Sequence, residues 1–281
     1  MNFDSYWSAV DEELATIPAR PVLDLVPART TDEATSYTVR LTSTGPYRVF
    51  GHLSIPAGDG PFPALLQTPR HGSVNLVPHP NDRSRYVVFA LTHRGQRLAD
   101  EGFSAAYPGL LTMGIDDPAS YIYRGIAADC LRAAEFLMSL DEVDPARVAV
   151  SGDDLAVLTA ARRPGFSAVR VSGLLFYRAA EARLKSSHYP LEELNDHLRA
   201  GSSAQVVDDT LAYFDPVRHA SAVTARTLLA VDDPGWCAAL IEALPAASVY
   251  RLTHLDGTDN DFLDAWLAEL SGVPPMSKFL V

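Results

Sequence analysis

Short apolar runs alternate with helical patterns along most of this chain, and this alternation constrains the fold more than any other feature. The runs are rich in aliphatic residues and end at polar or glycine-containing turns, as buried strands of a parallel sheet do. They are PALLQTP (63–69), RYVVFALT (85–92), VDPARVAVSG (143–152), SGLLFY (172–177), RTLLAVDD (226–233) and SVYRLTHLDG (248–257). Helical spacing is clear in IYRGIAADCLRAAEFLMSL (122–140) and FLDAWLAEL (262–270). The pattern predicts an α/β fold with a doubly wound, mostly parallel sheet.

Two segments depart from this alternation. Apolar residues at helical spacing in the first turns predict an N-terminal helix, and SYTVRLTS (36–43) followed by YRVFGHLSIP (47–56) predicts a hairpin. Residues 1–60 are therefore expected to form a helix and hairpin extension. Residues 177–214 are expected to form a helical excursion near the active-site end of the sheet. The length of 281 residues suits one α/β domain over 1–281.

Charge and composition limit the partners of the chain. Lys and Arg number 23 against 35 Asp and Glu, a formal net charge of −12, which argues against nucleic acid or an anionic membrane as the main partner. The N-terminal stretch lacks the apolar core of a secretory signal, and no apolar run reaches the ~18 residues that span a bilayer. We therefore expect a cytoplasmic protein with a small-molecule substrate. Cys130 and Cys237 lack metal-like spacing and are expected to be buried free thiols.

The stretch VAVSGDDLAVLTAA (148–161) predicts a strand that turns directly into a helix. Hydrolases expose a nucleophile at such a turn, and its sharp geometry needs small residues two positions before and two positions after that nucleophile. Gly152 and Ala156 meet this requirement, with Asp154 between them. We therefore expect the geometry of this turn to be kept while its chemistry differs.

Several motifs in this order resemble one known family. They are FDSYW (3–7), HRGQ (93–96), YPGLLTMGIDDPASYIYRG (107–125), EVDPARVAVSG (142–152), YPLEELN (189–195) and TLAYFDPVRHA (210–220). The chain is similar to the acetyl xylan esterases and cephalosporin C deacetylases, carbohydrate esterase family 7, over nearly its whole length. The resemblance implies an α/β-hydrolase fold, removal of acetyl groups from sugars and related alcohols, no cofactor, and a homo-oligomer.

The same resemblance assigns the candidate catalytic residues. Family members carry Gly-Gly-Ser-Gln-Gly where this chain has residues 152–156, so Asp154 stands in place of the nucleophilic serine. The acid of the triad is expected directly after a strand, where Asp232 and Asp233 lie. His254 is the candidate histidine after the last strand, about three residues earlier than the family spacing implies.

The oxyanion loop also differs from the family pattern. In TPRHGSVN (68–75), Arg70 and His71 replace a glycine followed by an aromatic residue. We expect the oxyanion and substrate pocket to involve Arg70, His71, Gly72 and the amide of Leu155.

An aspartate at this turn is compatible with several chemistries. Attack on an acetyl ester would form a high-energy anhydride, whereas attack on a saturated carbon would form an ordinary alkyl ester, as in the dehalogenases and epoxide hydrolases, whose elbow these residues resemble locally. Alternatively, Asp154 acts as a general base for water. An N-cap role alone explains an aspartate here equally well. A metal site formed by these aspartates and His254 has no supporting motif.

These alternatives give two functional hypotheses. The first is a cofactor-free, metal-free hydrolase that acts on a small acylated or activated substrate through Asp154, His254 and Asp232 or Asp233. The second is a relative that has lost catalysis and serves as a binding or assembly subunit, or an enzyme redeployed in biosynthesis with non-ester chemistry.

Overall fold

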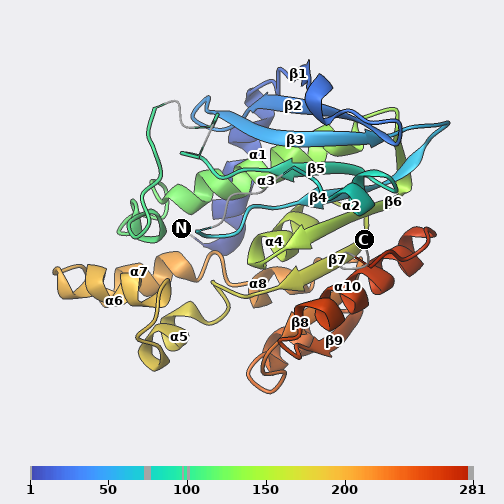
Figure 1. Cartoon of the computed structure of the whole chain (residues 1–281). Coiled ribbons are helices and arrows are strands. Elements are labelled where there is room, and N and C mark those ends of the chain that lie inside the picture. The colour runs from blue at the N-terminus through green and yellow to red at the C-terminus, as the bar shows by residue number, and fades with distance from the viewer. Residues whose placement is uncertain (1, 73–76, 97, 100–101, 278–281) are drawn as a thin grey trace.

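The structure, a computed structural model, describes residues 2–72, 77–96, 98–99 and 102–277, and nine strands within these ranges form one sheet (Figure 1). The strands are β1 (Val22–Leu25), β2 (Ala34–Thr42), β3 (Arg48–Pro56), β4 (Phe62–Gln67), β5 (Val87–Leu91), β6 (Val143–Gly152), β7 (Phe166–Ser172), β8 (Arg226–Val231) and β9 (Ala247–Arg251). Their spatial order is β1-β2-β3-β5-β4-β6-β7-β8-β9. The pairs β1-β2, β2-β3 and β3-β5 are antiparallel. The pairs β5-β4, β4-β6, β6-β7, β7-β8 and β8-β9 are parallel. The predicted hairpin and mostly parallel sheet are confirmed.

Helices cover both faces of this sheet. The longer ones are α1 (Phe3–Thr16), α3 (Ile122–Met138), α4 (Asp154–Arg162), α6 (Leu191–Arg199), α7 (Ala204–Leu211) and α10 (Asp256–Ser271). The short ones are α2 (Pro80–Arg83), α5 (Ala179–Lys185), α8 (Val217–Ala220), α9 (Ala238–Ala243) and the 3₁₀ turns η1 (Pro27–Arg29) and η2 (Leu110–Thr112). Within the described ranges, none has the length and apolar character needed to cross a membrane.

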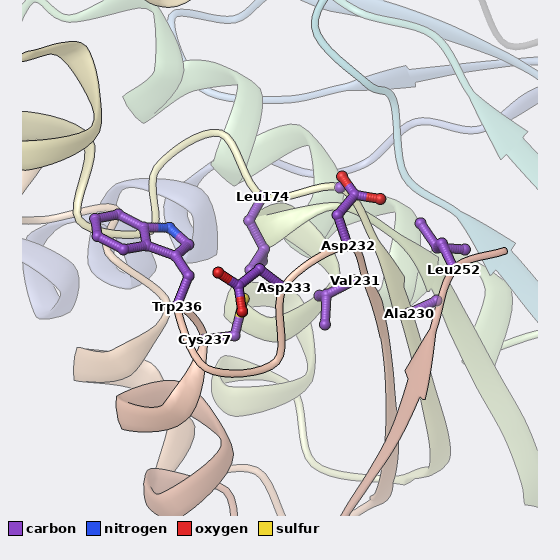
Figure 2. Close-up of a pocket in the computed structure, with 9 residues that line it drawn as sticks. Leu174, Ala230, Val231, Asp232, Asp233, Trp236, Cys237 and Leu252 are labelled. Carbon is purple, nitrogen blue, oxygen red and sulfur yellow. The ribbon is translucent and has the colours of Figure 1, made fainter. Parts of the chain in front are cut away.

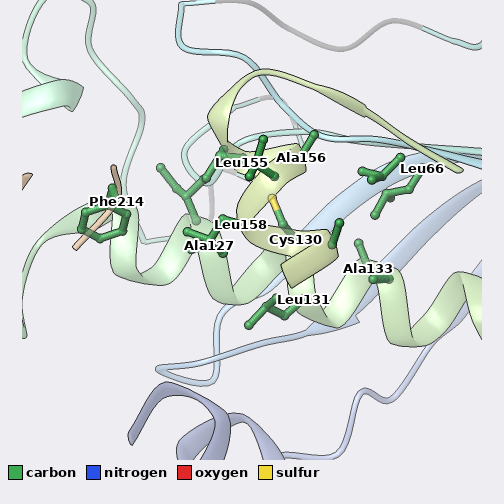
Figure 3. Packing of buried hydrophobic residues seen from close by; sticks show 14 of the residues in the cluster. Leu66, Ala127, Cys130, Leu131, Ala133, Leu155, Ala156, Leu158 and Phe214 are labelled. Carbon is green, nitrogen blue, oxygen red and sulfur yellow. The ribbon is translucent and has the colours of Figure 1, made fainter. Parts of the chain in front are cut away.

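Alternation along the strands separates the two faces. Leu66 and Phe89 belong to the main core with α1, α3 and α4, whereas Leu65 and Val88 pack with Leu267 of α10. Figure 3 shows how closely α3 and α4 approach, with Cys130 of α3 beside Leu155 and Ala156 of α4. Cys130 and Cys237 are buried free thiols, as predicted.

One predicted strand is wrong. SGLLFY (172–177) was expected to be a strand because it is apolar, but β7 ends at Ser172 and the following residues form a loop that leads to α5. The strand is instead FSAVRVS, in which half-buried polar residues interrupt the buried ones, so it does not form an apolar run. One of these polar residues is Arg170, whose Nε donates to Ser151 Oγ at 3.1 Å. The loop after β7, residues 173–177, therefore has amides that no strand ladder uses.

The helical excursion lies at the end of the sheet where β6 and β7 finish. Figure 1 shows α5, α6 and α7 together at lower left, away from α10. Glu193 anchors α6 to the turn before η2, because its Oε1 accepts from the Gly109 amide at 2.7 Å and the Thr112 amide at 3.3 Å. The HRGQ motif is also tied down, since Arg94 Nε lies 2.6 Å from Asp129 Oδ2 in a buried ion pair.

Candidate functional site

The turn from β6 into α4 is tight but has no strained residue at its tip. A Cβ atom added to Gly152 would lie 1.9 Å from Thr68 Oγ1, so only glycine fits there. Asp153 caps α4 with φ −102° and ψ −145°, and its Oδ1 accepts from the Leu155 amide at 3.0 Å. Among the described non-glycine residues, positive φ occurs at Arg20, Arg178 and His254. The strained elbow expected around Asp154 is therefore absent, because the chain enters α4 through an ordinary N-cap.

Asp154 is sealed inside the protein. Its exposed fraction is 0%, and its carboxylate faces the loop after β7. Oδ2 accepts from the amides of Leu175 and Phe176, the latter at 3.0 Å, and Oδ1 accepts from the Tyr177 amide at 3.1 Å. These contacts hold the loop against the start of α4, an arrangement we call the Asp154 clamp.

Burial governs the protonation of both aspartates. It raises the pKa of Asp153 to about 6, although the Leu155 amide acts in the opposite direction. Burial, followed by the charge of Asp153, raises the pKa of Asp154 to about 8, although the amides of Phe176 and Leu175 act in the opposite direction. The two groups lie close enough to titrate as a pair. Asp154 therefore carries a proton more readily than an ordinary aspartate.

Asp153, and not Asp154, lines a cavity. This cavity, which we call the Asp153 pocket, has a volume of about 220 Å³. Its lining residues are Arg70, His71, Asp153, Ser172, Gly173, Leu174, Leu175 and Pro190. Because β4, β6 and β7 are parallel, the segments that follow them meet at one edge of the sheet. Arg70 donates to Ser172 Oγ across the pocket.

His71 is held between two tyrosines. Its Nδ1 lies 2.7 Å from Tyr123 Oη, and its Nε2 lies 2.7 Å from Tyr189 Oη. Burial lowers the pKa of His71 to about 4, so the imidazole is neutral near pH 7. Gly72 follows with φ +74°, and residues 73–75 of the predicted loop lie outside the described residues.

His254 and Asp232 form a pair on the surface. His254 Nε2 lies 3.1 Å from Asp232 Oδ1, with 73% and 69% of the two side chains exposed. Asp233 Oδ1 accepts from the Gly235 amide at 2.9 Å, the ordinary turn that its sequence indicates. Asp232 and Asp233 line a second cavity of about 210 Å³, and Figure 2 shows Cys237 and Trp236, which also line it, near Asp233.

The structure thus brings together part of the predicted set. Arg70 and His71 share the Asp153 pocket, and His254 meets Asp232, whereas Asp154 is bonded to the amides of residues 175–177. The amide of Leu155 donates to Asp153 and is therefore engaged. In the part of the chain that the structure describes, no three His, Cys, Asp or Glu side chains are placed to hold a metal ion.

Sequence reasoning missed three residues of this site. Asp153 was interpreted as a helix cap, a neighbouring charge or one ligand of a metal site without a supporting motif, and not as a pocket residue. Tyr123 and Tyr189 lie in the motifs YIYRG and YPLEELN, which pointed to the family without showing a role. Only their shared contact with His71 shows that they converge.

Comparison with known proteins finds a matching family. Residues 1–234 match the profile of the family described as acetyl xylan esterase (AXE1). The acetyl esterase Axe7A of Xylanibacter ruminicola is 25% identical over 252 residues, which cover 79% of this chain and 54% of that protein. The chain therefore spans about half the length of this curated relative.

Solved structures agree with that match. The acetyl xylan esterase from Paenibacillus sp. R4 superposes with a TM-score of 0.80 at 24% identity, covering 94% of each chain. Acetyl xylan esterase 1 from Thermoanaerobacterium sp. gives a TM-score of 0.82 at 21% identity, covering 95% of this chain and 93% of the other. The predicted α/β-hydrolase fold is confirmed.

Proposed function

Because the chain belongs to the acetyl xylan esterase family, whose characterised relatives are hydrolases, we propose that it hydrolyses a small acylated substrate in the Asp153 pocket. The observation that carries this proposal is the placement of Asp153. Asp153 lines the pocket together with Arg70 and His71, whereas Asp154 is bound to backbone amides. We therefore assign the general-base role to Asp153 and a structural role to Asp154.

In this proposal Asp153 is a general base. A pKa of about 6 leaves it largely ionised near neutral pH while keeping it basic enough to accept a proton. It takes a proton from a water molecule, whose oxygen bonds to the acyl carbon. The carbon–oxygen bond to the leaving group then breaks, and the proton passes from Asp153 to the leaving alcohol. The products are a carboxylic acid and an alcohol.

Arg70 supports the charge that develops on the acyl oxygen. The Leu155 amide already donates to Asp153, so we assign the oxyanion to the Arg70 guanidinium instead. Arg70 reaches across the pocket to Ser172, which places its cationic group at the pocket lining. A preorganised donor of this kind is worth roughly a hundredfold or more in rate. The apolar side chains of Leu174, Leu175 and Pro190 suit a short acyl group.

The test is release of 4-nitrophenol from 4-nitrophenyl acetate. We expect turnover by the wild type and a loss of roughly 10²- to 10⁴-fold in Asp153→Asn. Asparagine caps a helix about as well as aspartate, so this variant should keep the fold. The matched control is Asp154→Asn, assayed after circular dichroism has shown it folded, and we expect its rate to stay within about tenfold of the wild type. Loss confined to Asp154→Asn would return the catalytic role to Asp154.

A second candidate function is a binding or assembly subunit without catalysis. The unstrained turn after β6 and the exposed His254 favour this function. A serine-type triad instead carries its nucleophile on a strained turn, within hydrogen-bond reach of its histidine. A wild type inert toward acetyl, propionyl and butyryl esters of 4-nitrophenol would support this function. A folded protein that still binds acetylated xylo-oligosaccharides in calorimetry would then identify its ligand class.

A further inference from the structure

We propose that Tyr189 is a positioning residue that locks the loop carrying Arg70 and His71 to the helical excursion. The bond joins Tyr189 Oη and His71 Nε2, and it holds the imidazole ring of His71 in one orientation. Its consequence for catalysis rests on the proposed function of the Asp153 pocket. Its structural part stands on the contacts alone.

The contacts form a continuous polar chain. Tyr189, which precedes α6, has 51% of its surface exposed, yet its hydroxyl lies 2.7 Å from His71 Nε2. On the other side of the ring, Nδ1 lies 2.7 Å from the hydroxyl of Tyr123 on α3, which is 1% exposed. The chain therefore links the excursion, the oxyanion loop and the buried helix α3.

Aromatic packing restricts the imidazole further. Its centroid lies 5.2 Å from the ring of Tyr107, 5.5 Å from that of Tyr189 and 6.2 Å from that of Tyr123. With both nitrogens bonded and these rings nearby, rotation of His71 would break contacts. A neutral imidazole with two hydroxyl partners donates to one and accepts from the other, so both ring nitrogens of His71 are satisfied in this orientation.

The chain continues toward the aspartates. The ring of Tyr123 meets that of Phe176 in a T-shaped contact at 4.7 Å, and the Phe176 amide donates to Asp154 at 3.0 Å. The oxyanion loop and the Asp154 clamp therefore pack against the same tyrosine. A shift of His71 would therefore displace both the oxyanion loop and, through Tyr123, the loop held by the Asp154 clamp.

Tyr189 can be tested without unfolding α6. Glu193 independently anchors this helix to the Gly109 and Thr112 amides. Phenylalanine at position 189 keeps the ring and its packing and removes only the hydroxyl. The matched control is Tyr37→Phe, a half-buried tyrosine in β2.

The experiment combines imidazole nitrogen NMR with kinetics. In the wild type at neutral pH we expect His71 to show one protonated and one unprotonated nitrogen, assigned by their absence in His71→Gln. In Tyr189→Phe we expect the Nε2 resonance to shift and amide exchange at residues 70–72 to accelerate roughly tenfold. We also expect kcat/KM to fall roughly tenfold, with Tyr37→Phe unchanged in all these measurements.

The outcomes separate this inference from the proposed function. Unchanged His71 resonances and unchanged amide exchange in Tyr189→Phe would overturn the lock. Altered resonances in a protein that has no esterase activity would support the lock and reject the proposed hydrolysis. Altered resonances with undiminished kcat/KM would overturn the positioning role.

Discussion

The turn after β6 and the loops after β8 and β9 carry the carboxylates and histidine expected to act together, yet their surroundings are opposite. Asp154 is 0% exposed and bound by backbone amides, whereas 69% of the Asp232 side chain and 73% of the His254 side chain face solvent. The loop after β7 closes over the first position and leaves the other two open. The carboxylate of Asp154, at the position expected for a nucleophile, thus holds a loop in place, while its neighbour Asp153 lines the pocket.

The largest expected effect is on stability at the clamp. Asp154→Ala removes the acceptor for the amides of Leu175, Phe176 and Tyr177, and unsatisfied buried amides are costly. We expect the free energy of unfolding to fall by about 3 kcal/mol or more. Urea denaturation measures it, with Asp232→Ala as the exposed control. Equal losses of unfolding free energy in Asp154→Ala and Asp232→Ala would show that the buried and the exposed aspartate do not differ in their contribution to stability.

A smaller effect is expected on the pH dependence of stability. The folded protein holds the proton of Asp154 up to a pKa of about 8, whereas an unfolded aspartate releases it near ~3.9. The folded state therefore binds more protons between these values, and its stability falls as pH rises through that window. Asp153, with a pKa of about 6, adds to the lower part of the window.

Asp154→Asn cannot titrate, which isolates its contribution. We expect a flatter dependence of the unfolding free energy on pH than in the wild type, most clearly between about pH 6 and about pH 8. Urea denaturation across this range gives the two slopes. A wild-type stability that rises over the same range would show that the amides outweigh burial and keep Asp154 ionised.

The smallest effect is expected at the exposed pair. His254→Asn removes the contact with Asp232 while keeping a residue that tolerates φ +61°. We expect a change below about 0.5 kcal/mol in the free energy of unfolding and less than about twofold in esterase rate. A large loss of rate with stability unchanged would show that His254 takes part in catalysis despite its exposure.

Much of the fold was predictable from the sequence, because apolar runs and helical spacing are local signals. The runs at 85–92, 143–152 and 226–233 became β5, β6 and β8. The error at 172–177 arose because an apolar composition does not distinguish a buried loop from a strand. Arg170, half-buried but bonded to Ser151, obscured the real strand β7.

The site was less predictable, because its geometry depends on contacts between distant segments. The family resemblance assigned Asp232 and His254 to positions after two strands, and in the structure these strands, β8 and β9, are neighbours and the two side chains meet. The direction of the Asp154 side chain depends on amides about twenty residues later, which no local pattern reveals. The homo-oligomer and the cytoplasmic location remain predictions.

The Asp154 clamp also limits which side chains position 154 can carry. A serine at position 154 would offer one hydroxyl oxygen, on a shorter side chain, to amides that now bind two carboxylate oxygens. The side chain at position 154 and the conformation of the loop after β7 therefore depend on each other. A shorter side chain at this position would require a compensating change in that loop, since its amides would need a different acceptor.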